Sequence, residues 1–208
     1  MELITQKRSP GRPLGTKKGG AIRPLTEDEL VRFFKATHAN KKWRLMFNLA
    51  LHFGLRSKEL ATLRLEDVDR ENLQITIRSC KGGRIRTYTA DELPAGIWRL
   101  VDGWLKQRRT HKQNPYVFPS RLDPTGAMSA IGTQCAFRNV CRRAGITGHS
   151  IHDLRHTCGQ RLAKMNFSAT RISRWLRQKS SQSAEVYITL EEDKELGRHA
   201  AEAMPIYS

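Results

Sequence analysis

The sequence has no apolar run long enough to cross a membrane. Its longest apolar stretch, residues 45–55, is interrupted by Asn48 and His52 and is about half the roughly 20 residues that a spanning helix needs. The first residues contain no apolar segment of signal-peptide length, and no lipidation motif is present. We therefore expect a cytoplasmic protein that is neither exported nor anchored to a membrane.

Acidic residues are scarce relative to basic ones. The chain has 20 Asp and Glu against 37 Lys and Arg, a formal net charge of +17. Residues 1–24 carry a net +5, so +12 remains in residues 25–208 and the folded part is itself basic. A basic fold points first to nucleic acid and second to an anionic membrane surface. Without a lipidation motif, we favour nucleic acid.

Paired cysteine spacing is also absent. None of the four cysteines lies in a C-x-x-C motif, which favours a reduced, intracellular protein with mostly buried thiols: Cys80, Cys135, Cys141 and Cys158. A histidine-rich segment, residues 149–158, lacks the glutamate of a zinc-protease motif and contains Arg155. An arginine among metal ligands would repel the cation, so we expect no metal site.

The first 24 residues are rich in Gly, Pro and basic residues and have little to bury. We interpret them as a flexible basic arm that contacts DNA through Arg12, Lys17 and Lys18. The Gly11-Arg12-Pro13 triplet resembles the core of an AT-hook, which places an arginine in a narrow minor groove. The alternative, which we favour, is sequence-independent attraction to phosphates.

Apolar periodicity beyond the arm predicts a mainly α fold with a small antiparallel β-sheet or hairpin, an α+β class. Thr26 and Glu29 form a capping box at the first helix, and Gly54 ends the second. Two alternating segments, residues 73–77 and 85–89, flank a Gly82-Gly83 turn and predict a hairpin. The predicted helices cover residues 57–63, 97–105, 137–144, 154–165, 172–176 and 190–203.

Cleavage of a phosphodiester without a metal requires guanidinium groups on the non-bridging oxygens, a nucleophile, and an acid for the leaving oxygen. Arg56 follows the helix-ending Gly54 and precedes a helix, a position that favours phosphate binding, and Glu59 can hold its guanidinium. An exposed arginine in an ordinary helical ion pair is the alternative.

Three further segments carry candidate residues. In H-D-L-R-H-T, His152 and Arg155 share a helical face, although a helix-capping histidine is the plain alternative. Lys81 lies at the predicted hairpin tip and could equally be a solvated turn lysine. Tyr187 lies in the short amphipathic segment S-A-E-V-Y-I, and taken alone it is better explained as a buried core tyrosine.

Taken in order, these segments resemble the tyrosine recombinase family, which includes the phage integrases. The resemblance covers residues 25–190 and rests on G-L-R-x-x-E-L, K-G-G-R-x-R, H-x-L-R-H-T, a serine-rich turn and then a tyrosine. The C-G-x-x-L-A segment that follows H-x-L-R-H-T looks most like the short fimbrial-inversion recombinases. The resemblance to the family divides the chain into three parts: the arm at 1–24, a catalytic domain at 25–190 and a C-terminal helical tail at 191–208.

The resemblance implies a role for each candidate. Tyr187 would form a 3′-phosphotyrosyl link, Arg56 and Arg155 would hold the phosphate, and Glu59 would support Arg56. Lys81 would protonate the leaving 5′-oxygen, and His152 would assist proton transfer at the tyrosine. The family usually has L-G-H-S-S before the tyrosine, whereas here the segment reads L-R-Q-K-S. Gln178 therefore takes the place of a histidine or tryptophan; it can donate a hydrogen bond but cannot supply a proton as an imidazolium can.

The resemblance also implies partners. These are double-stranded DNA with paired recombination sites, a tetramer of this chain passing through a Holliday junction, and accessory DNA-bending proteins, with no metal, ATP or other cofactor. The resemblance further implies a protein of a prokaryote, a phage or another mobile element that is associated with the nucleoid. Many relatives carry a separate helical domain before the catalytic domain, and we expect the basic arm to supply part of that affinity here. The C-terminal helix would pack on a neighbouring protomer or on its own chain.

Two alternatives to an active recombinase remain: a non-catalytic DNA-binding relative, slowed by Gln178, and an enzyme similar to type IB topoisomerases without strand exchange. Several arginines are candidate DNA contacts or merely a solvated face: Arg84, Arg86, Arg138, Arg142 and Arg143.

Overall fold

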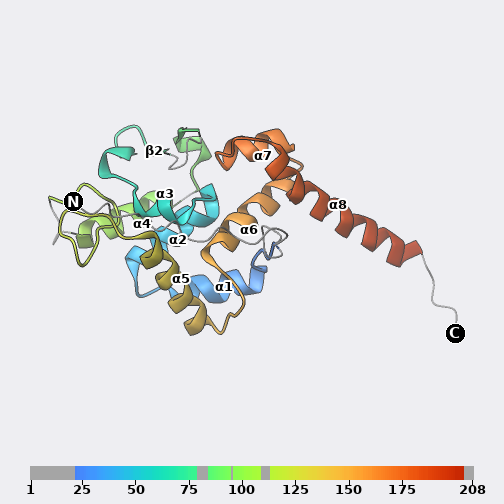
Figure 1. Cartoon of the computed structure of the whole chain (residues 1–208), viewed down its shortest axis with the longest axis horizontal. Helices are drawn as coiled ribbons and strands as arrows, with labels where there is room; N and C mark the ends of the chain where they lie inside the picture. Colours follow the sequence, from blue (N-terminus) through green and yellow to red (C-terminus); the bar gives the residue numbers. More distant parts are fainter. Residues whose placement is uncertain (1–21, 79–83, 95, 109–112, 204–208) are drawn as a thin grey trace, which may run out of the picture.

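The computed structural model describes residues 22–78, 84–94, 96–108 and 113–203, with only the backbone for residue 194 and residues 196–203. Helices dominate this part of the chain, as predicted, and a three-stranded antiparallel sheet lies beside them (Figure 1). The helices are α1 (Glu27–Ala36), α2 (Lys41–Phe53), α3 (Ser57–Ala61), α4 (Ile97–Gln107), α5 (Ala130–Ala144), α6 (Ile151–Lys164), α7 (Ala169–Trp175) and α8 (Gln182–Ala203).

The helix ends follow local sequence signals. The capping box at Thr26 and Glu29 is present at the start of α1, and the side chain of Asn40 caps α2. Gly54 ends α2 in the left-handed conformation, with φ of +57°, which confirms its predicted role. A Cβ at Gly54 would also collide with Leu176 Cδ2, so glycine favours the close packing here as well as the turn.

The sheet has the order β1 (Val68–Asp69), β2 (Gln74–Ile77), β3 (Arg86–Tyr88). Ile75 pairs with Tyr88, and both side chains are buried, so one face of the hairpin packs on the core. Two 3₁₀ turns, Leu65–Asp67 and Ala90–Glu92, flank the sheet. The predicted strands were too long: Leu73 has φ of +52° and stands before β2, and Ile85 is exposed. The predicted Gly82-Gly83 turn lies outside the described residues.

Two apolar clusters hold the helices together. In the larger, Phe33 of α1, Phe47 of α2 and Phe137 of α5 lie with ring centroids 5.1–5.9 Å apart, a spacing at which aromatic pairs attract beyond simple burial. The smaller cluster joins α6, α7 and α8 through Cys158, Ile172, Leu176, Ala184 and Tyr187 among its members. The C-terminal helices are therefore attached to the body mainly through α6.

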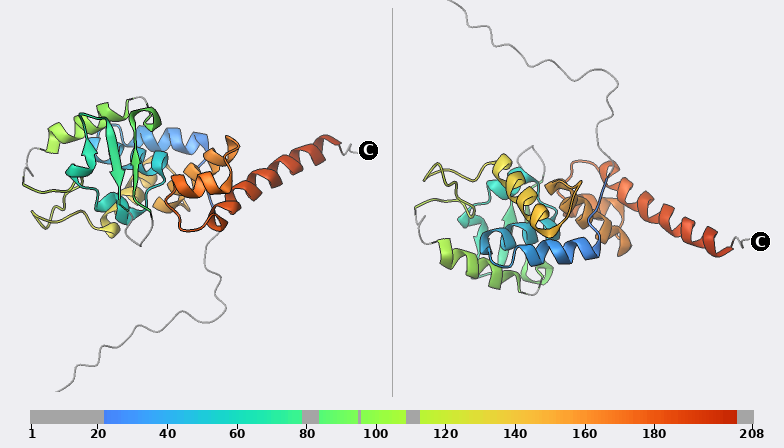
Figure 2. Two further views of the ribbon diagram at one scale, coloured as in Figure 1. Left: turned by 90° about the horizontal axis from the view of Figure 1, so that it is seen from above. Right: turned by 90° about the horizontal axis from the view of Figure 1, so that it is seen from below.

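Helix α8 begins at Gln182 rather than near residue 190, where the separate charged helix was predicted. No proline or glycine interrupts residues 182–196, so the helix that starts after the serine-rich turn continues through Tyr187 and beyond. Its distal part extends away from the rest of the molecule in both views of Figure 2. Among the described residues, none of the helices combines the length and hydropathy needed to span a bilayer.

Candidate active site

The first part of the site lies where α2 ends and α3 begins. Arg56 immediately precedes α3, and the carboxylate of Glu59 accepts hydrogen bonds from the Arg56 backbone N–H at 2.9 Å and from its Nη1 at 2.8 Å. The expected pairing of these residues is therefore present. The Glu59 side chain is fully buried, whereas 31% of the Arg56 side chain remains exposed. Glu59 thus fixes a guanidinium that still faces solvent.

Arg155, on α6, connects this corner to the turn after α7. Its Nη1 donates to the carbonyl of Gly54 at 2.5 Å and its Nη2 to the carbonyl of Leu176 at 2.7 Å. Burial, followed by the neighbouring charges of Arg56 and Arg177, lowers the pKa of Arg155 to about 10, so it remains charged at neutral pH. Two of its five N–H donors are used by these carbonyls, which leaves three.

Tyr187 lies in the second turn of α8 and is 2% exposed. Its ring packs against α6 at Gly159, where a Cβ would approach Tyr187 Cε2 to 2.6 Å. Burial raises the pKa of the hydroxyl, the charge of Arg155 opposes this, and Arg56 also lowers it. The hydroxyl therefore lies within the electrostatic field of both site arginines.

The histidine at the tyrosine is His156, not His152. His156 Nδ1 lies 3.1 Å from the Tyr187 hydroxyl. No described hydrogen bond joins His152 to Tyr187. Burial is the largest cause that lowers the pKa of His156 below its ordinary value, so the imidazole is neutral at pH 7. The motif H-x-L-R-H-T contains this histidine, but nothing in its spacing ranks it above His152.

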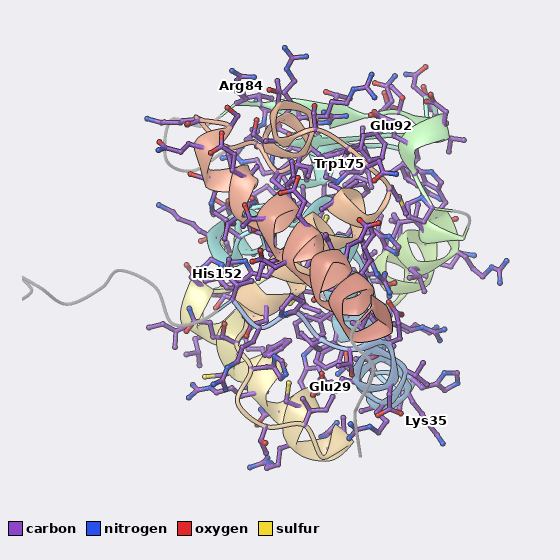
Figure 3. The ribbon with its side chains drawn as sticks, turned by 90° about the vertical axis from the view of Figure 1, so that its right-hand side faces the viewer. Glu29, Lys35, Arg84, Glu92, His152 and Trp175 are labelled. Carbon is purple, nitrogen blue, oxygen red and sulfur yellow. The ribbon has the colours of Figure 1, made fainter. Side chains whose placement is uncertain are left out.

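His152 occupies the first turn of α6 and is exposed (Figure 3). Neighbouring protein nevertheless desolvates its imidazole, and this, followed by the charges of Arg155 and Arg56, lowers its pKa. His152 therefore belongs to the arginine side of the site. His149, by contrast, lies between the carboxylates of Glu29 and Asp153, at 3.3 and 3.5 Å. Within the described part of the chain, no three His, Cys, Asp or Glu side chains are grouped to hold a metal.

Gln178 follows Arg177 in the turn between α7 and α8 and is half-buried. Its Oε1 is buried and has no hydrogen-bond partner among the described residues. The neighbouring Arg177, which sequence reasoning missed, is the largest fully buried side chain among all the residues that the structure describes. Its Nη2 lies 3.0 Å from Glu59 Oε2. The one available signal was the arginine at a position where the resemblance implies glycine.

The remaining predicted contacts divide into three groups. Lys81, Arg12, Lys17 and Lys18 lie outside the described residues. Arg84 is exposed at the edge of the sheet (Figure 3), and Arg138, Arg142 and Arg143 are exposed on α5. Arg86 differs, because it pairs with Glu92 at 2.5 Å and stacks 4.9 Å from the rings of Tyr88 and Trp175. Its guanidinium is thus engaged within the fold.

Comparison with known proteins gives consistent results. The profile of the Phage integrase family matches residues 23–194. Tyrosine recombinase XerA of Pyrococcus furiosus is 27% identical over 165 residues, 78% of this chain and 56% of the relative. The type 1 fimbriae regulatory protein FimB of Escherichia coli K12 is also 27% identical, over 73% of this chain and 76% of FimB. The chain thus spans just over half the length of XerA.

Solved structures show the same fold. The crystal structure of XerA recombinase superposes with a TM-score of 0.72 at 23% identity, covering 96% of this chain and 68% of XerA. A lambda integrase tetramer bound to a Holliday junction gives a TM-score of 0.61 at 18% identity, covering 82% of this chain and 49% of the integrase. The predicted mainly α fold with a small sheet is thereby confirmed.

Proposed function

Because the chain belongs to the phage integrase family of tyrosine-type site-specific recombinases, we propose that it cleaves and rejoins DNA through a covalent bond to Tyr187. The DNA 3′-phosphate is carried on the tyrosine, and strands are exchanged between paired sites by way of a Holliday junction.

The observation that carries this proposal is the meeting of three elements at one place. Arg155 of α6 binds the carbonyl of Gly54, two residues before Arg56, and the charges of both arginines act on the hydroxyl of Tyr187 of α8. Two guanidiniums next to a tyrosine hydroxyl provide charge for the non-bridging oxygens of a phosphate and a nucleophile for its phosphorus. Arg56 and Arg155 accordingly bind the scissile phosphate.

The proton of the nucleophile passes to His156 in this mechanism. The Tyr187 hydroxyl donates to Nδ1 of the neutral imidazole, 3.1 Å away, which is within the range required of a general base. As the tyrosine oxygen bonds to phosphorus, His156 takes the proton, and the bond from phosphorus to the 5′-oxygen breaks. Lys81 protonates that oxygen, and His152 and Gln178 hydrogen-bond the phosphate.

The bond energy is retained in the phosphotyrosyl link. A 5′-hydroxyl of the partner strand attacks the phosphorus and gives its proton to Lys81. The bond from phosphorus to Tyr187 breaks, and His156 returns the proton to the tyrosine oxygen. One phosphoester replaces another at each step, so the exchange needs no ATP. The nucleophile and the proton donors and acceptors proposed for both steps are side chains of this chain.

We extend the assembly of a relative to this chain. The lambda integrase in the comparison is a tetramer on a Holliday junction, and four copies on two duplexes are the counterpart proposed here. The distal part of α8 extends away from its own body (Figure 2), which favours its packing on a neighbouring protomer. The basic arm and the exposed arginines of α5 would bind DNA phosphates.

A non-catalytic DNA-binding relative is the second candidate, and Gln178 is the residue that favours it. An amide at this position hydrogen-bonds phosphate but supplies neither charge nor proton. Such a protein would bind DNA with strong salt dependence and form no covalent product.

Formation of a covalent adduct separates the two. We would incubate the full chain, in EDTA, with DNA flanking its own gene that is nicked to trap cleaved ends, beside Tyr187→Phe. A denaturant-resistant protein–DNA adduct, present in the wild type and absent in Tyr187→Phe, is the expected result. Tight binding without any adduct would overturn the recombinase proposal and favour the second candidate.

A further inference from the structure

Arg177 is a buried arginine with an unfavourable backbone. It follows α7 with φ of +54°, in the left-handed region that residues with a Cβ rarely adopt. Its side chain is 0% exposed, and burying a charge is unfavourable unless it is paired and hydrogen-bonded. The surroundings must therefore compensate both the backbone strain and the buried charge.

The guanidinium of Arg177 donates hydrogen bonds to acceptors on four elements. Nη1 donates to the carbonyls of Phe53 and Trp175, both at 3.0 Å, and to the hydroxyl of Tyr88. Nη2 donates to the carboxylate of Glu59 at 3.0 Å and to the carbonyl of Gly54 at 3.3 Å. Among the described residues, only Nε lacks a partner.

The carboxylate of Glu59 is shared between two arginines. One oxygen accepts from Arg56 Nη1, and the other accepts from Arg177 Nη2 and the Arg56 backbone N–H. Burial alone would raise the pKa of Glu59, but the charge of Arg177, the largest opposing influence, followed by Arg56, brings it below its ordinary value. Arg177 thus keeps Glu59 ionised, and ionised Glu59 holds Arg56.

Arg177 also lies between the two halves of the site. The Gly54 carbonyl accepts from both Arg155 and Arg177, and the Leu176 carbonyl, next in the chain to Arg177, accepts from Arg155. Gln178 is the following residue, where the resemblance implies a histidine, and position 177 is where it implies glycine. Compared with the family pattern, this chain lacks the ionisable imidazole at position 178 but has a buried guanidinium at position 177. Positive charge near Arg56 is therefore retained.

We propose that Arg177 is a positioning residue that fixes the Arg56 guanidinium through the shared Glu59 carboxylate and links it to the turn carrying Gln178. It touches no reacting atom, and its importance for cleavage rests on the proposed recombinase function. Glycine relieves the left-handed backbone, so Arg177→Gly removes the guanidinium without adding strain.

The first test measures single-turnover adduct formation at saturating DNA, with DNA affinity measured separately. Arg177→Gly is expected to slow cleavage at least about tenfold with little change in affinity, and added guanidinium ion should restore part of the rate by filling the vacated site. The effects of Arg177→Gly and Glu59→Gln should be non-additive, because both act through one carboxylate.

The matched control is Arg108→Gly. Arg108 is also buried and donates to the backbone carbonyls of Tyr116 and Asn114, but among the described residues it contacts no carboxylate, and it lies outside the site. An equal loss of rate in Arg108→Gly, or no rescue of Arg177→Gly by guanidinium, would overturn the proposal. If Arg177→Gly does not fold, Arg177→Lys takes its place, with an expected intermediate rate because one ammonium cannot span the same partners.

A second test does not depend on catalysis. A ¹³C NMR titration of the Glu59 carboxyl group, assigned with Glu59→Gln, should give a higher pKa in Arg177→Gly than in the wild type. Equal pKa values would refute the role of Arg177. If the wild type forms no adduct, the recombinase function fails while this titration still decides whether Arg177 controls Glu59.

Discussion

At the scale of single residues, Tyr187 and His156 form the pair on which the proposed chemistry depends. Their contact joins α8 to α6 at 3.1 Å, and burial affects the two groups in opposite directions. It raises the pKa of the tyrosine and lowers that of the histidine. Burial, the largest influence on both pKa values, therefore favours a neutral acceptor and a protonated donor at physiological pH.

Substitution His156→Gln is expected to slow adduct formation about 100-fold, the usual scale for loss of a general base. In the wild type the rate should fall as the pH drops through the lowered pKa of His156, below about 6.5, because a protonated imidazole accepts no proton. Single-turnover rates between pH 5.5 and 8, in about half-unit steps, measure both effects. The variant His152→Gln should show the same fall in rate at low pH. If that fall is absent in His152→Gln, the proton acceptor is His152 instead of His156.

Gln178 allows a gain-of-function test. Gln178→His should raise the cleavage rate, by up to about tenfold, because a charged donor binds phosphate about twice as strongly as a neutral amide. Gln178→Ala should lower it. The same adduct assay measures all three proteins, and a slower Gln178→His would mean that the turn is adapted to glutamine.

The sequence predicts local pairs well and buried long-range ones poorly. The Arg56–Glu59 contact spans three residues at a helix start, so spacing was sufficient to predict it. Arg177 reaches Glu59 across 118 residues, and an arginine in a polar turn is normally exposed. His152 and His156 share one face of α6, so periodicity could not say which of them reaches a tyrosine on another helix.

At the scale of elements, the packing of α8 on α6 positions Tyr187, the proposed nucleophile. The contact depends on Gly159, in the middle of α6, where the Tyr187 ring fills the space of a side chain. Glycine lowers helix propensity by about 1 kcal/mol relative to alanine, so its presence there reflects the close approach of α8.

Gly159→Ala should therefore abolish most adduct formation and lower the free energy of unfolding by about 1–3 kcal/mol, the usual cost of overpacking. Gly103→Ala in α4 is the matched control, since its Cβ would meet Lys41 Cδ at an ordinary 3.8 Å; it should stabilise by up to about 1 kcal/mol. Denaturant unfolding and the adduct assay measure both. Full activity in Gly159→Ala would show that α8 is placed by other contacts.

Periodicity predicted the helices because each buries one apolar stripe, as α4 does with Ile97, Val101 and Trp104. The two-residue strand β1 carries too short a pattern to detect. The start of α8 was placed too late because the amphipathic segment around Tyr187 is short and did not indicate that one helix continues from Gln182 past residue 190. Element boundaries thus depended on tertiary packing more than on local pattern.

At the scale of the whole molecule, we expect positive charge to govern the proposed DNA binding. Removal of residues 1–20 deletes five basic residues and Glu2. The logarithm of the DNA binding constant should then depend less steeply on the logarithm of salt concentration, by up to about 4 units of slope. Fluorescence anisotropy at several salt concentrations measures the change. Equal slopes for the full chain and the truncated chain would exclude phosphate contacts by the arm.

Three histidines in the described part of the chain are expected to make stability depend on pH. Burial is the largest cause that lowers the pKa of His52, His152 and His156, so the unfolded state binds more protons below about pH 6.5. Their stabilisation is complete above that pH and is lost as the pH falls through the folded pKa values, at most about 1.4 kcal/mol per pH unit for each proton. His152 is exposed and should contribute least.

Urea unfolding at about pH 7.5, 6.5 and 5.5 should thus give free energies of unfolding that decrease from the highest pH to the lowest. His52→Gln combined with His156→Gln should flatten the dependence. Carboxylates do not account for it, because those with lowered pKa values titrate below this window. A stability that is constant or rises toward pH 5.5 would contradict the assignment of neutral buried histidines.

The most direct measurement of the central claim is the identity of the residue that becomes attached to DNA. Digestion of the trapped adduct with protease and nuclease, followed by mass spectrometry, should find a nucleotide on the peptide containing Tyr187, linked through a 3′-phosphate, with a free 5′-hydroxyl on the released strand. A nucleotide on Tyr88, Tyr116 or Tyr207, or a 5′-phosphate linkage, would contradict the account.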